Sequence, residues 1–100
     1  MAKLEIDYIA ETDTDWAFLR FRQEGFPGYT LPLSYLPEFV EALEQKSSDV
    51  HYFLMNYGVQ HSSSSTKLCV STSERPLLQL DKGQCAKLID HLRREYATAL

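Results

Sequence analysis

Two apolar stripes with helical spacing constrain the fold of this chain more strongly than any other feature of its sequence. The first stripe consists of Leu36, Phe39, Val40 and Leu43. The second stripe consists of Cys85, Leu88, Ile89, Leu92 and Tyr96. Each has the i, i+3, i+4, i+7 spacing of one buried helix face, and each follows a short segment that ends in leucine. The sequence therefore predicts two amphipathic helices, one in each half of the chain.

Residues at the expected helix ends agree with this assignment. Ser34 is a suitable N-cap for the first helix, and Pro37 falls in its first turn, where the missing N–H of proline costs little. We expect this helix to end near Lys46. Asp81 is the expected N-cap of the second helix, because Gln84 follows three residues later and completes a capping box. Both helices thus carry recognisable start signals.

The segments before each helix have strand patterns. Three strands are expected in the first half, at residues 3–10, 16–23 and 29–33. In the second half, the apolar and aromatic run 50–57 is expected to be a central strand buried on both faces. Residues 58–65, which include His61 and a run of serines, are expected to form a polar loop. The remaining strands of this half are expected at residues 67–72 and 77–80.

This order of elements predicts an α+β fold in a single domain, residues 1–100. We expect one antiparallel sheet with the two amphipathic helices packed on one side of it. The elements repeat as βββα-βββα, in pseudo-repeat halves of residues 1–48 and 49–100. The repeat concerns structure alone, because sequence identity between the halves is negligible.

The composition predicts a soluble protein in a reducing compartment. No run of apolar residues is long enough for a signal peptide or a membrane span, so we expect a cytoplasmic location and no membrane association. The two cysteines, Cys69 and Cys85, form neither a CxxC pair nor a disulfide framework. We interpret them as small, partly buried thiols.

Charge is distributed unevenly along the chain. The first 50 residues contain ten acidic and four basic side chains, a net charge of −6, whereas the second half carries +2. The acidic half argues against a general nucleic-acid binder, which normally presents a net basic surface. The acidic residues Glu5, Asp7 and Asp13 belong either to a solvated surface or to one that mimics the phosphates of nucleic acid toward a basic partner.

The strand expected at residues 16–23 carries the most informative side chains. Its alternation places on one face Trp16, Phe18, Arg20 and Arg22. Two aromatic rings and two guanidiniums on one face could stack on bases and contact phosphates, as in proteins that bind single strands. Alternatively, the rings pack in the core or at a homodimer interface, with the guanidiniums at its rim. We expect a homodimer, because a small aromatic domain with edge strands has apolar surface to cover.

No motif in the sequence predicts catalysis. The chain lacks a glycine-rich phosphate loop, an HExxH metal site and a GxSxG nucleophile. The histidines His51, His61 and His91 have no spacing that supports a shared site, so we expect neither a metal nor a cofactor. An enzyme would need a cleft built from residues distant in sequence, and this class stays open.

The order of strands followed by a helix, twice over, resembles the PUR and whirly group of folds. The resemblance implies curved sheets with helices on one side, and single-strand binding through aromatic and basic strand residues. A PUR repeat has four strands, whereas we expect three in each half. Fold alone does not carry function. The leading hypothesis is therefore a small non-enzymatic regulator, an acidic inhibitor or accessory subunit, that binds a protein partner. A single-stranded nucleic-acid-binding module is the alternative.

Overall fold

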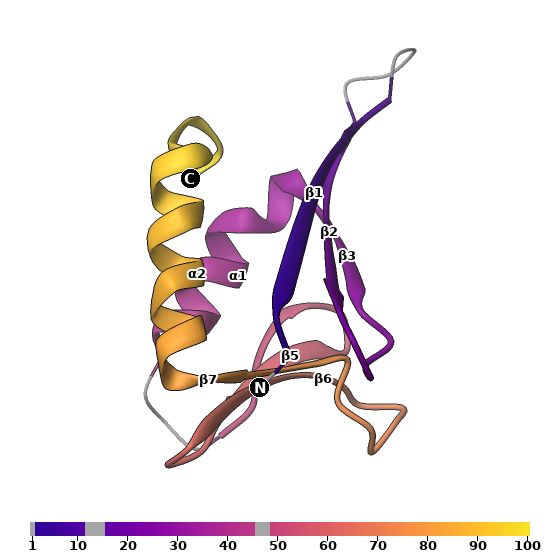
Figure 1. Cartoon of the computed structure of the whole chain (residues 1–100). Helices are drawn as coiled ribbons and strands as arrows, with labels where there is room; N and C mark the ends of the chain where they lie inside the picture. The colour runs from indigo at the N-terminus through magenta and orange to yellow at the C-terminus, as the bar shows by residue number, and fades with distance from the viewer. Residues whose placement is uncertain (1, 12–15, 46–48) are drawn as a thin grey trace.

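Two antiparallel sheets, hydrogen-bonded separately, hold two helices between them in the computed structural model, which describes residues 2–11, 16–45 and 49–100 (Figure 1). The first sheet has the order β1 (Leu4–Ala10), β2 (Ala17–Gln23), β3 (Tyr29–Pro32). The second has the order β4 (His51–Leu54), β5 (Tyr57–His61), β6 (Ser65–Val70), β7 (Leu78–Asp81). The helices are α1 (Leu36–Glu44) and α2 (Lys82–Glu95), with short 3-10 turns η1 (Leu33–Tyr35) and η2 (Ala97–Ala99). The α+β class is confirmed, and the described order of elements is βββα-ββββα.

The prediction of one strand over residues 50–57 is wrong, because the run folds back on itself as a hairpin. β4 ends at Leu54 and β5 begins at Tyr57, and Met55 between them has a backbone φ of 53°. Its side chain is 86% exposed although it lies within an apolar run. The polar loop expected at residues 58–65 is also wrong, since β5 continues to His61. This hairpin supplies the extra strand of the second half.

The prediction of a single sheet is also wrong, because the strands form two separate sheets. A side chain rather than a strand joins β2 to β7. The amide of Gln23, at the end of β2, accepts a hydrogen bond from the Gln79 N–H at 2.8 Å and donates one to the Gln79 carbonyl at 2.6 Å. Its Nε2 also donates to the Ala2 carbonyl at 2.9 Å. Gln23 is 5% exposed. One buried amide therefore occupies the edge of β7, where a further strand would pair.

A tight turn makes a second connection between the sheets. The N–H of Gly28 donates to the Leu77 carbonyl at 3.0 Å. Gly28 has a φ of +82°, and an added Cβ atom would lie 2.8 Å from the Phe21 carbonyl oxygen. Both the backbone conformation and the available space therefore require glycine at this position.

The two helices begin in different ways. The expected capping box of α2 is confirmed: Asp81 Oδ1 accepts from the Gln84 N–H at 2.7 Å, and Gln84 Oε1 accepts from the Asp81 N–H at 3.0 Å. The expected cap of α1 is wrong, since Ser34 lies within η1 and Tyr35 occupies the N-cap position without a side-chain hydrogen bond. Because η1 tightens the approach to α1, Ser34 comes one residue too early to cap it.

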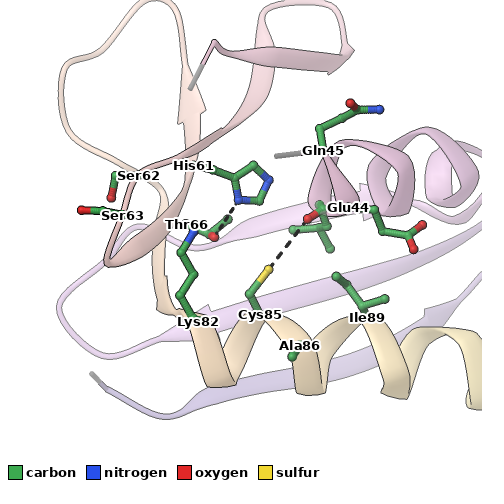
Figure 2. A pocket seen from close by; sticks show the side chains of 11 residues that line it. Glu44, Gln45, His61, Ser62, Ser63, Thr66, Lys82, Cys85, Ala86 and Ile89 are labelled. Carbon is green, nitrogen blue, oxygen red and sulfur yellow. Dashed lines mark hydrogen bonds between the residues drawn. The ribbon is translucent and has the colours of Figure 1, made fainter. Parts of the chain in front are cut away.

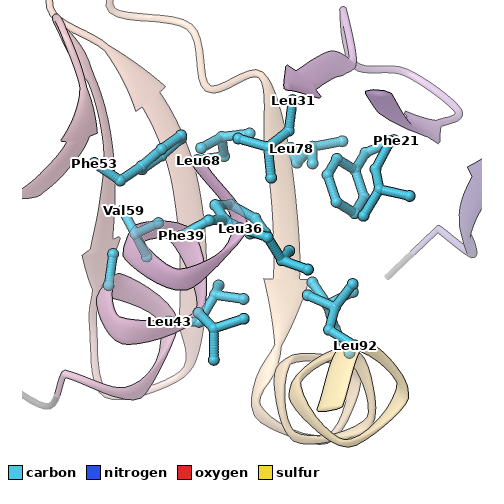
Figure 3. Packing of buried hydrophobic residues seen from close by; sticks show 14 of the residues in the cluster. Phe21, Leu31, Leu36, Phe39, Leu43, Phe53, Val59, Leu68, Leu78 and Leu92 are labelled. Carbon is cyan, nitrogen blue, oxygen red and sulfur yellow. The ribbon is translucent and has the colours of Figure 1, made fainter. Parts of the chain in front are cut away.

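The core lies where the helices meet both sheets. α1 packs on β4 and β5, and α2 packs on β6 and β7 (Figure 1). β1 contacts the end of α2 through the stacked rings of Tyr8 and Tyr96. The Phe39 ring of α1 lies between Phe21 of the first sheet, at a centroid distance of 5.4 Å, and Phe53 of the second, at 5.0 Å (Figure 3). The stripe of α1 is buried along its whole length, as predicted. One hydrophobic cluster therefore includes residues from both halves of the chain.

Replacing Gln23 with leucine tests the bridge between the sheets. We expect the Gln23→Leu variant to lose about 3 kcal/mol of unfolding free energy, because the buried backbone groups of Gln79 lose their partners. Gln79→Leu is the matched control, since that residue contributes its backbone to the bridge, and we expect a loss below about 0.5 kcal/mol. Urea unfolding followed by circular dichroism measures both. Equal losses in the two variants would contradict the bridge.

Tyr29 provides a pH-dependent test of the core. Burial, and then the neighbouring Tyr57 phenol, raises the pKa of Tyr29 from 10.0 to about 12. Because the folded pKa exceeds the unfolded one, this contribution to stability is complete below pH 10 and is lost as the pH rises toward 12. We expect unfolding free energy to fall across this window, and to fall less in Tyr29→Phe. Parallel pH profiles for the two proteins would show that Tyr29 contributes nothing.

Candidate interaction surface

The first sheet has one surface that points away from the helices, and we call it the outer face. Alternation along β2 buries Leu19 and Phe21 completely and directs the residues between them outward. Cross-strand register then places Asp7 opposite Arg20 and Glu5 opposite Arg22. The side chains of the outer face are Glu5, Asp7, Ile9, Phe18, Arg20, Arg22, Thr30 and Pro32, with Trp16 beside them.

Ion pairs across β1 and β2 neutralise one end of the outer face. Arg22 Nε lies 2.9 Å from Asp7 Oδ2, and Arg22 Nη2 lies 3.4 Å from Glu5 Oε2. Arg20 Nε is 3.7 Å from the same Asp7 oxygen. Two guanidiniums and two carboxylates thus form a ladder with no net charge. A ligand phosphate would have to compete with these carboxylates for Arg20 and Arg22.

An aromatic pair lies at the other end of the outer face. The rings of Trp16 and Phe18 stack with their centroids 6.3 Å apart and an angle of 11° between their planes. Trp16 is 58% exposed, and Phe18 is half-buried. Trp16 also lines a shallow hollow of about 430 Å³ with Leu33 and Ala99. Neither ring belongs to the core, so the alternative that both rings fill the core is wrong.

The structure brings together most of the binding residues proposed from the sequence. Six of the seven lie on or beside the outer face, namely Glu5, Asp7, Trp16, Phe18, Arg20 and Arg22. The seventh, Asp13, lies outside the described residues. The pairing of the acidic with the basic members was not predicted, since it depends on the register between β1 and β2. The acidic side chains of this face are therefore compensated by their neighbours.

A second cluster of chemically capable side chains lines a groove of about 720 Å³ between α1, α2 and β5 (Figure 2). His61 Nδ1 lies 2.9 Å from Thr66 Oγ1, and His61 Nε2 lies 3.1 Å from the Ala42 carbonyl oxygen. Because a carbonyl can only accept, Nε2 donates to it, and Nδ1 pairs with the Thr66 hydroxyl, which can donate or accept. Both ring nitrogens are thus engaged, which leaves neither to act as a base on a ligand.

The thiol of Cys85 lies in the same groove and contacts the end of α1. Cys85 is buried, and its Sγ lies 4.0 Å from the Leu43 carbonyl oxygen. Burial raises the pKa of Cys85, and the opposing effects of Thr66 and Lys82 are smaller. A raised pKa disfavours the thiolate, which is the nucleophilic form. The contacts of His61 and Cys85 connect β5 and α2 to the end of α1. The buried position of His61 was missed from the sequence, although its alternation with Val59 could have indicated it.

The ion-pair ladder predicts little effect on stability. Double-mutant cycles with Asp7→Ala and Arg22→Ala should give a coupling energy below about 1 kcal/mol, because both side chains are partly exposed to water. The coupling should shrink further at about 1 M salt. Thermal unfolding of the four proteins measures it. A coupling energy above about 2 kcal/mol would contradict this prediction, because it would mean that the ladder contributes substantially to the stability of the fold.

Within residues 2–11, 16–45 and 49–100, no group of three or more histidine, cysteine or acidic side chains could hold a metal ion. In the same ranges, no helix is both long and apolar enough to cross a membrane. Comparisons with protein-family models, curated proteins and solved structures give no match.

Proposed function

We propose that this chain is a non-enzymatic interaction protein that binds a protein partner through the outer face. The observation that carries the proposal is the exposed Trp16–Phe18 stack beside the neutral ion-pair ladder. Tryptophan and arginine are the residue types that most often dominate protein–protein binding energy. A stacked pair on a hydrogen-bonded sheet is already ordered, so binding it costs little side-chain entropy.

The character of the partner follows from the ladder. Because Arg20 and Arg22 already have carboxylate partners, the face offers alternating charges rather than a basic or acidic field. Such a pattern favours a protein surface that has both signs of charge around an apolar centre. A second copy of the chain satisfies this requirement as a homodimer, since each guanidinium could face a carboxylate of the other copy. An inhibitor or accessory subunit would use the same face on a different protein.

Single-stranded nucleic acid is the second candidate ligand. It is favoured by the exposure of Trp16, whose ring could stack on a base beside Arg20 and Arg22. It is disfavoured by the carboxylates, which compete for both guanidiniums. The proposal also includes a reducing, cytoplasmic location, in keeping with the free thiols of Cys69 and Cys85.

Site-specific cross-linking tests the proposed function. A photo-crosslinking amino acid at Thr30, which is exposed and pairs with Arg20, should capture a protein, either a second copy or another chain. Trp16→Ala should lower the yield at least about tenfold, because it removes the main contact. Tyr52→Ala is the matched control, since Tyr52 is also 58% exposed but lies on the second sheet. If Trp16→Ala gives the same cross-linking yield as the unchanged protein, the proposal is refuted.

A fluorescence titration separates the two candidates. Trp16 is the single tryptophan, so its emission reports directly on the outer face. We expect no quenching by oligothymidine at low salt. Quenching that weakens steeply as salt is added would instead establish nucleic-acid binding as the function of this face.

A further inference from the structure

A groove of about 500 Å³ runs between the edge of β1 and helix α2, on the opposite side of the first sheet from the outer face. We call it the β1–α2 groove. Leu4 and Ile6 of β1 and Leu88 of α2 form its apolar floor. Its rim is formed by Lys3, Gln84, Lys87 and His91. The helix residues of the groove follow the i, i+3, i+4, i+7 spacing, so one continuous stripe of α2 faces β1.

Both ends of the β1–α2 groove are fixed by contacts between the strand and the helix. At one end the rings of Tyr8 and Tyr96 stack at a centroid distance of 6.2 Å, and His91 packs edge-on to Tyr96 at 6.1 Å. At the other end Gln84 Nε2 donates to the Ala2 carbonyl at 2.8 Å. The groove therefore has a defined length along β1, on the order of six residues of extended chain.

β1 presents an edge that can accept another strand. Its only strand partner among the described residues is β2, and their register is continuous from Leu4 to Ala10 without a bulge. The strand contains neither proline nor glycine, so it has none of the usual backbone features that block an edge. Alternate residues of β1 therefore direct N–H and carbonyl groups outward, next to the groove.

The charge of the groove selects the ligand. Lys3, Lys87 and His91 line it, and no carboxylate does, although the whole chain carries a net charge of −4. Neither lysine forms an ion pair with a described carboxylate. An apolar floor with a basic rim complements an extended peptide whose inward side chains are apolar and acidic.

A second copy of this chain fits the edge poorly. The antiparallel register that pairs two β1 strands over their whole length, with the inner faces together, places Asp7 opposite Asp7. Moving one strand by two residues shortens the overlap and places Glu5 opposite Asp7 in one direction and Asp7 opposite Ile9 in the other. Like charges directly opposite on neighbouring strands are destabilising. A different chain is therefore the favoured occupant.

We propose that β1 and α2 together bind an extended acidic peptide segment of another protein by strand addition. The peptide backbone pairs with the outer edge of β1, and every second side chain enters the β1–α2 groove. Apolar side chains contact Leu4, Ile6 and Leu88, and acidic ones lie near Lys87 and Lys3. This site is separate from the outer face, so one protein could hold two partners at once.

Binding of designed peptides tests the proposal. The probe is a short fluorescent peptide with the repeat Thr-Val-Thr-Glu. Its valine and glutamate side chains share one face of the strand, and its threonines share the other. Its Kd for the full chain should rise about tenfold with Lys87→Glu, because one attraction becomes a repulsion. Lys82→Glu, on the same helix but outside this groove, should change the Kd less than about twofold. Trp16→Ala should have no effect, which distinguishes this site from the outer face.

Two peptide controls examine the binding mode. A peptide with lysine in place of glutamate should bind at least about tenfold more weakly. An acidic peptide methylated on alternate backbone nitrogens should not bind, because it cannot pair with β1. Amide hydrogen exchange should slow at β1 in the acidic complex. Equal Kd values for the acidic, lysine and methylated peptides would overturn the proposal, and so would no binding of the acidic peptide at about millimolar concentration. It is also overturned if the β1 amides are protected without peptide because the chain forms a homodimer through β1.

Discussion

The side-chain amide of Gln23 is the interaction on which the arrangement of the two sheets depends. It pairs with both backbone groups of Gln79 and so occupies the edge of β7 in place of another strand. A side chain satisfies the backbone N–H and carbonyl groups of one residue of that edge, whereas a strand would satisfy those of several residues and extend the sheet. The first sheet is therefore free to turn away from the second, and the space between them holds α1 and α2 (Figure 1). Phe39 can then contact phenylalanines of both sheets.

The separation of the sheets also determines which charges act together. The first half of the chain has a large acidic excess, and from the sequence that excess was one of the two features taken to indicate a binding surface. In the folded protein, Glu5 and Asp7 share the outer face with Arg20 and Arg22 and are neutralised by them. Meanwhile Lys3 and Lys87, from opposite ends of the chain, meet beside one groove. Local charge, rather than the charge of each half, is what a partner would meet.

Features coded by neighbouring residues could be predicted, and those coded by distant contacts could not. The stripe of α1 and the capping box of α2 depend on residues within a few positions of each other, and both were predicted. Alternation likewise predicted which side chains of β2 face outward. The division of residues 50–57 was missed because an apolar run has the same composition whether it is one strand or two. The Gln23–Gln79 bridge spans 56 positions, and no local pattern marks it.

The exposed position of Trp16 has a consequence for how the unfolding of this protein can be followed. Its indole is the only one in the chain and lies outside the core, so its emission reports on the end of the β1–β2 hairpin. Far-ultraviolet circular dichroism reports mainly on α1 and α2. Coincident transitions in the two signals would mean that the first sheet and the helices unfold as one cooperative unit. Separate transitions would give the free energy at which that sheet opens while the helical layer stays folded.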